Sequence, residues 1–147
     1  MSNPKTGVFP CYENQFQIGT KDSDEASENI ADCEEFGVSF DNGVEEWNPF
    51  EEKGWKKRLM TAKALTISVK GKRNIGDKGN DEVASCTFAN GKDAERPFKW
   101  TFPDGATLFL ANAVISVTSN GGGASTGVAP LEFEVMSNGK PVYTPAV

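Results

Sequence analysis

The sequence predicts a mainly β protein, built as a β-sandwich or partly open barrel with one flanking α-helix. Three observations support this prediction. Several segments alternate apolar and polar side chains with a period of two. These segments begin and end at Asn, Asp, Gly or Pro residues, which are typical of turns. Only one stretch has the spacing of a helix. At 147 residues the chain is long enough for one packed core, so residues 1–147 are interpreted as a single domain.

The clearest strand covers residues 65–69, where Leu65, Ile67 and Val69 alternate with Thr66 and Ser68. Further strands are expected at 98–102, 107–118, 131–135 and around 142–143. The 107–118 segment is long enough to bend or break near its Asn112. The Pro-Asp-Gly sequence at 103–105 predicts a turn after the 98–102 strand.

A β-hairpin is expected between residues 36 and 47. Residues 36–40 alternate in polarity, and the Asp-Asn-Gly sequence at 41–43 is a turn signal. Residues 44–47 are then interpreted as the returning strand, which Asn48 and Pro49 end.

One amphipathic helix is expected after Asn80, the predicted N-cap. Asp81 and Glu82 suit the positive end of the helix dipole, and the Asn-Gly pair at 90–91 suits the C-terminal end. The apolar side of this helix should face the core through Val83, Ala84, Cys86, Thr87 and Phe88.

Two segments lack periodicity: the acidic stretch 20–29 and the glycine-rich stretch 120–127, which is interpreted as a flexible loop. Residues 1–30 are interpreted as an N-terminal arm that orders on assembly, together with this acidic loop. The N-terminus has no apolar signal region, and the longest apolar run, 108–117, is too short to span a bilayer. Synthesis in a cytosol without a membrane partner is therefore expected.

The sequence offers no catalytic, cofactor-binding or metal-ligating set, so no cofactor and no enzyme activity are expected. It contains no histidine, and its three cysteines (Cys11, Cys33 and Cys86) lie far apart, as expected of free thiols in a reducing compartment. The glycine loop lacks the Lys-Ser/Thr ending of a phosphate-binding loop. Binding of nucleic acid through 56–58 is disfavoured because the isoelectric point is about 4.7.

Charge is distributed unevenly along the chain. Residues 1–54 hold three Lys and thirteen Asp or Glu, a net charge of −10, whereas residues 55–147 carry a net +4. Within the second part, residues 55–78 hold eight basic side chains against Asp77 alone, a net +7. This pattern fits either separately solvated faces or complementary patches that meet between subunits.

A cluster of aromatic and basic residues supplies the candidates for a subunit interface, since Trp and Arg are enriched at interface hot spots. The alternative is a small satellite core beneath a loop. The candidates are Trp47, Phe50, Trp55, Lys56, Lys57 and Arg58.

The ordered combination of several motifs resembles the tail tube proteins of siphophages and prophages of Gram-positive bacteria. The similarity covers residues 33–145. Its motifs are VEEWNP at 44–49, GW at 54–55, LTISVKGKRN at 65–74, GDKGND at 76–81, FKWTFPDG at 98–105 and LEFEVMSNGKP at 131–141.

This resemblance implies rings, usually of six subunits, whose inner strands join into one continuous β-barrel. Stacked rings then form the conduit for DNA ejection in the virion tail. Assembly would occur in the host bacterial cytoplasm, with other copies of the chain and with tape-measure, tail-tip and tail-terminator proteins as partners. Duplex DNA would pass without specific binding. The predicted lumen residues are Glu35, Ser39, Asp41, Thr66 and Ser68, whereas Lys70, Lys72 and Arg73 should not line the channel unpaired.

Two other functions fit the same residues. The chain could form the inner tube of a contractile or bacteriocin-like tail, which shares the fold implied by the resemblance. It could instead be a monomeric immunoglobulin-like binding module, which would not form rings.

Overall fold

The computed structural model describes residues 6–146, and within them eight β-strands form one antiparallel sheet. The strand order is β2-β1-β5-β6-β7-β4-β3, with β8 paired to β6. This confirms the mainly β prediction, and the sheet is not closed into a barrel. The strands are β1 (Gln15–Ile18), β2 (Glu28–Asn29), β3 (Cys33–Trp47), β4 (Lys57–Lys72), β5 (Glu95–Thr101), β6 (Thr107–Asn120), β7 (Pro130–Met136) and β8 (Val142–Thr144).

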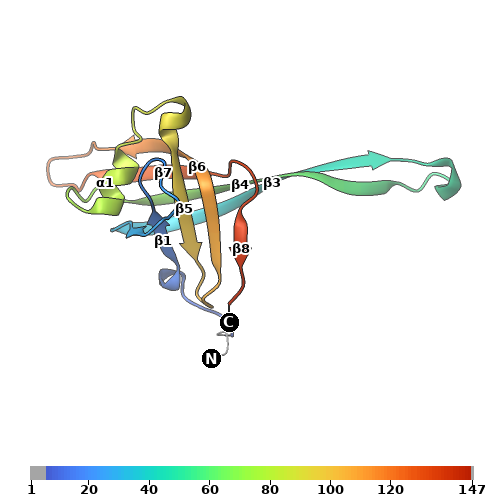
Figure 1. Cartoon of the computed structure of the whole chain (residues 1–147), viewed down its shortest axis with the longest axis horizontal. Helices are drawn as coiled ribbons and strands as arrows, with labels where there is room; N and C mark the ends of the chain where they lie inside the picture. The colour runs from blue at the N-terminus through green and yellow to red at the C-terminus, as the bar shows by residue number, and fades with distance from the viewer. Residues whose placement is uncertain (1–5, 147) are drawn as a thin grey trace.

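The sheet folds over on itself at β6, the strand shared by its two halves. The first half of β6 pairs with β5 and β8, and the second half pairs with β7. One half-sheet is therefore β2-β1-β5-β6-β8 and the other is β6-β7-β4-β3. In Figure 1, β5 and the first part of β6 run across the direction of β3 and β4.

The hydrophobic core lies between the two half-sheets and beneath helix α1 (Lys78–Ala84). Its side chains come from both half-sheets and from the helix, so the core joins all the layers. Fully buried members are Ile18, Ile67, Val83, Ala113, Phe98 and Val135.

The strands predicted by alternation are present. β4, β6, β7 and β8 contain the segments expected at 65–69, 107–118, 131–135 and 142–143. β5 covers residues 98–101 of the segment expected at 98–102 and begins earlier, at Glu95. The irregularity expected near Asn112 is a register shift: the three-residue step from Leu110 to Ala113 on β6 faces the two-residue step from Arg96 to Phe98 on β5. The strand bends there without breaking.

The hairpin turn expected at 41–43 is wrong. β3 continues through these residues to Trp47, and Gly43 pairs with Ala62 on β4. A Cβ atom at position 43 would lie 2.9 Å from the Ala62 Cβ, so glycine serves close strand approach here. The register shift beside it, between Gly43 and Val44, is a β-bulge. The chain turns later, after Asn48 and Pro49, which do end the strand as expected.

The helix is shorter than expected and begins earlier. Asp77, not Asn80, is the N-cap, because its carboxylate accepts the Asn80 backbone N–H at 3.0 Å. The helix ends at Ala84, and the Asn90 side chain instead caps a short 3-10 helix, Gly91–Ala94. Val83 and Cys86 do enter the core, but Phe88 is 96% exposed.

The N-terminal part holds a strand that the alternation pattern missed. β1 pairs with β5 and buries Phe16 and Ile18, so these residues belong to the sheet. Of the stretch 20–29, expected to be irregular, residues 20–27 are so, but 28–29 form β2. The glycine-rich stretch expected at 120–127 is irregular from residue 121, since Asn120 is the last residue of β6. In the part of the chain that the structure describes, no helix is long and apolar enough to cross a membrane.

Candidate assembly surfaces

The half-sheet β6-β7-β4-β3 has one face toward the core and one polar face. On β4, Leu65, Ile67 and Val69 point into the core and are at most 5% exposed, so the alternate residues point outward. The strand registers align the outward residues of the other strands with them. We name this surface the polar face: Glu35, Gly37, Ser39 and Asp41 of β3, Thr66, Ser68, Lys70 and Lys72 of β4, Glu132 and Glu134 of β7, and Ser116 and Ser119 of β6.

The five residues predicted to line a lumen all lie on the polar face. Ser39 and Thr66 are direct partners across β3 and β4, and Ser68 is opposite Gly37. Glu35 and Asp41 lie toward the two ends of the same row on β3. In the middle of the face, small hydroxyl side chains and Gly37 lie around one carboxylate, because Glu134 is opposite both Ser68 and Ser116. The row of Ser39 and Thr66 continues to Met136 and Val114.

The polar face is acidic on balance. It carries Glu35, Asp41, Glu132 and Glu134, and Glu34 joins them by reaching Lys72, with 3.0 Å between carboxylate oxygen and Nζ. Against these five acidic groups stand only Lys70 and Lys72, giving a net charge of −3. Lys70 lies between Glu35 and Glu132 in the strand registers, so both lysines have carboxylates as neighbours.

Arg73 is the third basic residue that was expected not to line the channel unpaired, and it points away from the polar face. Its guanidinium contacts Asp81 at 2.8 Å and donates to the Asn80 side chain at 2.8 Å. The Arg73 hydrogen bond, and next the backbone N–H of Gly76, lower the pKa of the Asp81 carboxyl from its ordinary value. This pair ties the end of β4 to helix α1.

Both edges of this half-sheet are open. In the described residues β3 has a partner only on its β4 side, and β5 pairs with β6 no further than Val114, which leaves 115–120 of β6 unpaired on that side. Each neighbouring pair from β3 to β6 is antiparallel, so β3 and β6 run in opposite directions. Unpaired N–H and C=O groups along such edges are templates for another strand.

A long two-stranded ribbon extends from the body (Figure 1). β7 pairs with β4 only from Thr66 to Lys72, so residues 41–64, which we name the arm, lack a third strand. The seven β3 residues of the arm span about 23 Å. Its apolar side chains stay largely uncovered: Val44 is 45% exposed, Leu59 59% and Met60 47%. A two-stranded hairpin is marginally stable alone in water, and the arm joins the larger sheet only at its base.

The six predicted interface residues gather at the tip of the arm. Phe50 is 100% exposed, Trp55 78% and Trp47 44%, so the alternative of a satellite core is wrong. In the turn at the tip of the arm, between Trp47 and Trp55, the Asn48 side-chain amide donates a hydrogen bond to the Gly54 carbonyl at 3.1 Å. The tip therefore presents three aromatic rings on a hydrogen-bonded turn.

The basic residues of the tip already have acidic partners in the same chain. Arg58 Nε donates to Glu46 at 2.6 Å, Lys56 lies 3.7 Å from Glu46, and Lys57 lies 3.6 Å from Glu52. The Arg58 hydrogen bond and then Lys56 lower the pKa of Glu46. Antiparallel pairing brings the acidic β3 beside the basic β4, so part of the charge asymmetry along the sequence is neutralised within the hairpin.

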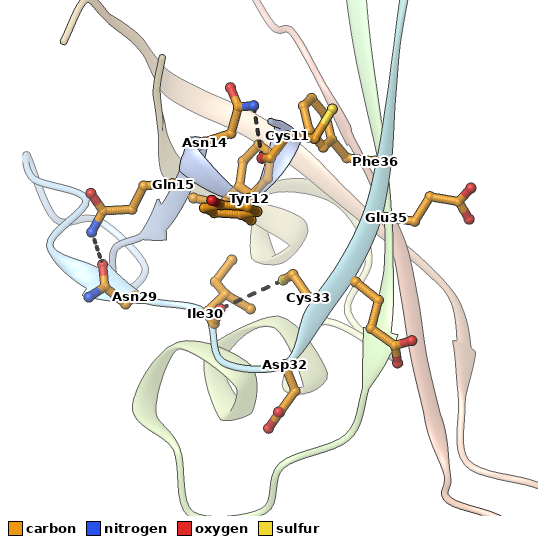
Figure 2. A pocket seen from close by; sticks show the side chains of 12 residues that line it. Cys11, Tyr12, Asn14, Gln15, Asn29, Ile30, Asp32, Cys33, Glu35 and Phe36 are labelled. Atoms are coloured by element: carbon orange, nitrogen blue, oxygen red, sulfur yellow. Dashed lines mark hydrogen bonds between the residues drawn. The ribbon is translucent and has the colours of Figure 1, made fainter. Parts of the chain in front are cut away.

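A pocket of about 510 Å³ lies beside the start of β3 and was not predicted (Figure 2). Its apolar side includes Phe16, Ile30, Cys33 and Phe36, and the Tyr12 ring lies across it. Glu35 projects from the opposite side of β3, toward the polar face. Burial raises the pKa of the Cys33 thiol to about 11, so it is neutral at physiological pH. No group of residues within 6–146 is placed to hold a metal ion.

No protein-family model and no curated protein sequence matches the chain. Several solved structures are similar to this chain. A chain from the tail of an empty gene transfer agent particle, refined with C6 symmetry, is 22% identical with a TM-score of 0.73, over 94% of this chain and all of that one. A chain from the virion of a native gene transfer agent particle is 19% identical with a TM-score of 0.70, over 94% of this chain and all of that one.

A contractile assembly also contains a similar chain. In the sheath-tube complex of an extracellular contractile injection system, a chain is 15% identical with a TM-score of 0.63, over 95% of this chain and 93% of that one. The protein described here therefore shares its fold with chains of particle tails and of a contractile sheath-tube assembly.

Proposed function

We propose that this chain is a tail tube subunit, whose copies join side by side into rings that stack into a hollow tube. The observation that carries the proposal is the polar face, bounded by two open and antiparallel edges. The fold shared with tail and sheath-tube chains supports it, as does the sequence resemblance to tail tube proteins.

The strand directions are compatible with ring closure. A rotation about an axis along the polar face keeps the direction of each strand, so β3 of one subunit meets β6 of the next in antiparallel orientation. Both open edges then gain ladder partners, and each subunit contributes four strands to a continuous barrel. We propose six subunits per ring, in line with the C6 symmetry of a similar tail.

The polar face suits the wall of a channel for DNA. Duplex DNA carries one negative charge per roughly 1.7 Å of axis, and cationic groups repeated at every ring would hold it. The net charge of −3, with both lysines beside carboxylates, avoids this. We propose that Glu35, Ser39, Asp41, Thr66 and Ser68 line the lumen and that DNA passes without specific binding.

The arm supplies the contact between rings. It carries exposed aromatic residues away from the body, and copies that meet head to tail propagate without closing on themselves. Trp47, Phe50 and Trp55 are the proposed anchors in the neighbouring ring, with Lys56, Lys57 and Arg58 around them.

The resemblance extends the proposal to the setting. The tube would belong to the virion tail of a siphophage or prophage of Gram-positive bacteria, assembled in the host cytoplasm. Its partners there would be tape-measure, tail-tip and tail-terminator proteins. The alternative of an inner tube in a contractile tail is supported by the fold shared with the sheath-tube chain; co-purification with a sheath protein would favour it.

The direct experiment is size-exclusion chromatography with light scattering, followed by negative-stain microscopy of the concentrated protein, alone and with tail-tip components. Rings and hollow tubes are the expected result. A protein that remains monomeric at every concentration, and in every mixture, would instead be the binding module considered above.

A further inference from the structure

Phe88 is a large aromatic side chain held outside the subunit on a fixed turn. It is 96% exposed, although the neighbouring Cys86 is buried in the core. The turn is anchored on its other side by Asn120, whose amide donates to the Thr87 hydroxyl at 2.9 Å. The Thr87 hydroxyl also donates to the Ala84 carbonyl at 2.6 Å. Phe88 therefore stands beside the end of the open edge of β6, on the core side of the half-sheet.

The opposite open edge carries a partly uncovered apolar strip on the same side of the half-sheet. Phe36, Val38 and Phe40 alternate with the polar-face residues of β3, so they point to the core side. Phe36 and Val38 are only partly buried and Phe40 is 64% exposed. The pocket of Figure 2 opens beside the first part of this strip, at Cys33 and Phe36.

The strand registers show that these two features lie at similar levels along the half-sheet. Asn120 of β6 is opposite Leu131 of β7, Leu131 is opposite Gly71 of β4, and Gly71 is opposite Cys33 of β3. Edge pairing without stagger therefore brings Asn120 of one copy level with Cys33 of the next. Strands in a barrel are tilted, so the edge strands of neighbouring subunits are shifted lengthwise relative to each other. If the shift moves one subunit toward the arm of the next, its Phe88 lies further along the strip, closer to Val38 and Phe40.

We propose that Phe88 of each subunit packs against the apolar strip of the adjacent subunit's β3 within the same ring. This proposal rests on the proposed ring assembly and adds a contact outside the barrel wall. The contact is heterologous, since Phe88 and the apolar strip lie at opposite edges of the half-sheet. The same contact repeats around the ring until the last subunit meets the first. An aromatic ring among Phe36, Phe40 and the neutral Cys33 thiol meets favourable partners.

Disulfide cross-linking in assembled protein tests the contact. Phe88→Cys is made in a Cys11→Ser background and combined with one strip thiol at a time: native Cys33, or Val38→Cys or Phe40→Cys together with Cys33→Ser. The matched control is Ser39→Cys with Cys33→Ser, on the same strand but on the polar face. Mild oxidation is followed by non-reducing electrophoresis.

At least one strip position should give a ladder of covalent oligomers that stops at the ring size, and the Ser39→Cys control should give none. The strip position that reacts reports the stagger, because a disulfide needs Cα atoms within about 7 Å. Tubes that form normally with no ladder at any strip position would overturn the contact and leave the tube function intact. A ladder extending beyond the ring size would move Phe88 to the contact between rings and also overturn the proposal. A wild-type chain that never assembles would overturn the tube function, and this contact with it.

A second variant pair covers the case in which the cysteine variant does not assemble. Phe88→Ser should raise the protein concentration required for assembly about tenfold or more, and Phe88→Leu should restore most of it. Because Phe88 is exposed, thermal unfolding of the monomer should not change in either variant. Unchanged assembly of Phe88→Ser would contradict the proposal.

Discussion

At the residue scale, one buried amide organises the junction between helix α1 and the open half-sheet. Asn80 is 1% exposed and makes four hydrogen bonds through its side chain. Its oxygen accepts from the Arg73 guanidinium and the Asn74 backbone N–H, at 2.8 and 3.0 Å. Its amide nitrogen donates to the carbonyls of Ala31 and Lys72, at 3.1 and 3.0 Å. The predicted N-cap role missed this, because capping is local whereas these partners come from two other segments, Ala31 before β3 and residues 72–74 at the end of β4.

Replacing this amide should destabilise the subunit. Asn80→Ala leaves two carbonyls and two donors without their partner, and we expect it to lower the free energy of unfolding by about 2–4 kcal/mol. The control is Asn90→Ala, which removes only an exposed cap on a 3-10 helix and should cost less than about 1 kcal/mol. Urea denaturation of the monomer measures both. Equal losses in the two variants would show that the buried network is unimportant.

The Arg73–Asp81 pair predicts a small acid sensitivity. The folded state lowers the Asp81 pKa below its ordinary value of 3.8, so the stabilisation is present above that pH and is lost as the pH falls through the folded-state pKa. Asp81→Asn should therefore flatten the dependence of stability on pH below about 3.8 and leave its shape near neutrality unchanged. Denaturation midpoints between pH 2 and 7 measure it, and identical slopes for both proteins would contradict the assignment.

At the element scale, the sequence predicted those strands that have one apolar face, because alternation reports burial directly. Leu65, Ile67 and Val69 identify β4 in this way. Alternation did not predict the arm, because its strands have no buried face and its Asp-Asn-Gly sequence imitates a turn. It also missed β1, which is only four residues long.

The candidate interface residues at 47–58 were predicted from composition, although their place at the end of an arm was not. Aromatic and basic residues beside turn signals indicate a contact surface. This surface lies far from the body because β3 pairs with β4 across more than ten residue pairs. Such long pairing requires that the chain does not turn before residue 48. The Phe88 turn was assigned to the core because helical spacing was extended past the real end of the helix at Ala84.

Removing the aromatic rings of the tip should separate ring formation from stacking. Phe50→Ser with Trp55→Ser leaves the body and the open edges unchanged, so rings should still form while tubes should not. The monomer should unfold within about 0.5 kcal/mol of the wild type, since both rings are exposed. Val8→Ser, an equally exposed apolar residue outside the arm, is the control. Microscopy of both variants gives the readout, and tubes of normal length in the double variant would contradict the role of the tip.

At the scale of the whole molecule, sheet order, fold-over at β6 and edge directions decide what the subunit can build. Alternation gives the inward and outward side of one strand, but it does not indicate which strands become neighbours. That Thr66 and Ser68, two of the proposed lumen residues, share one face could nevertheless be predicted from sequence, because they alternate with Leu65 and Ile67. The pairing of β3 with β4, and so the open β3 edge, required the structure.

The charge of the polar face should control how the tube treats DNA. Glu132→Lys with Glu134→Lys changes the net charge of this face from −3 to +1, and assembled tubes should then retain linear duplex DNA at low salt and release it as salt is raised. Glu25→Lys with Glu28→Lys makes the same change of charge in residues outside this face. Co-sedimentation of DNA with each variant is the measurement; equal retention by the two would show that the polar face does not line the channel.

The most direct test of the whole account is a structure of the assembled protein by electron cryomicroscopy. We predict stacked rings in which β3 of each subunit pairs antiparallel with residues 115–120 of β6 in its neighbour. Ser39, Thr66 and Ser68 should face the channel, and the arm should contact the next ring. A tube whose channel is lined by any other face, or an assembly in which the β3 edge stays unpaired, would contradict the account.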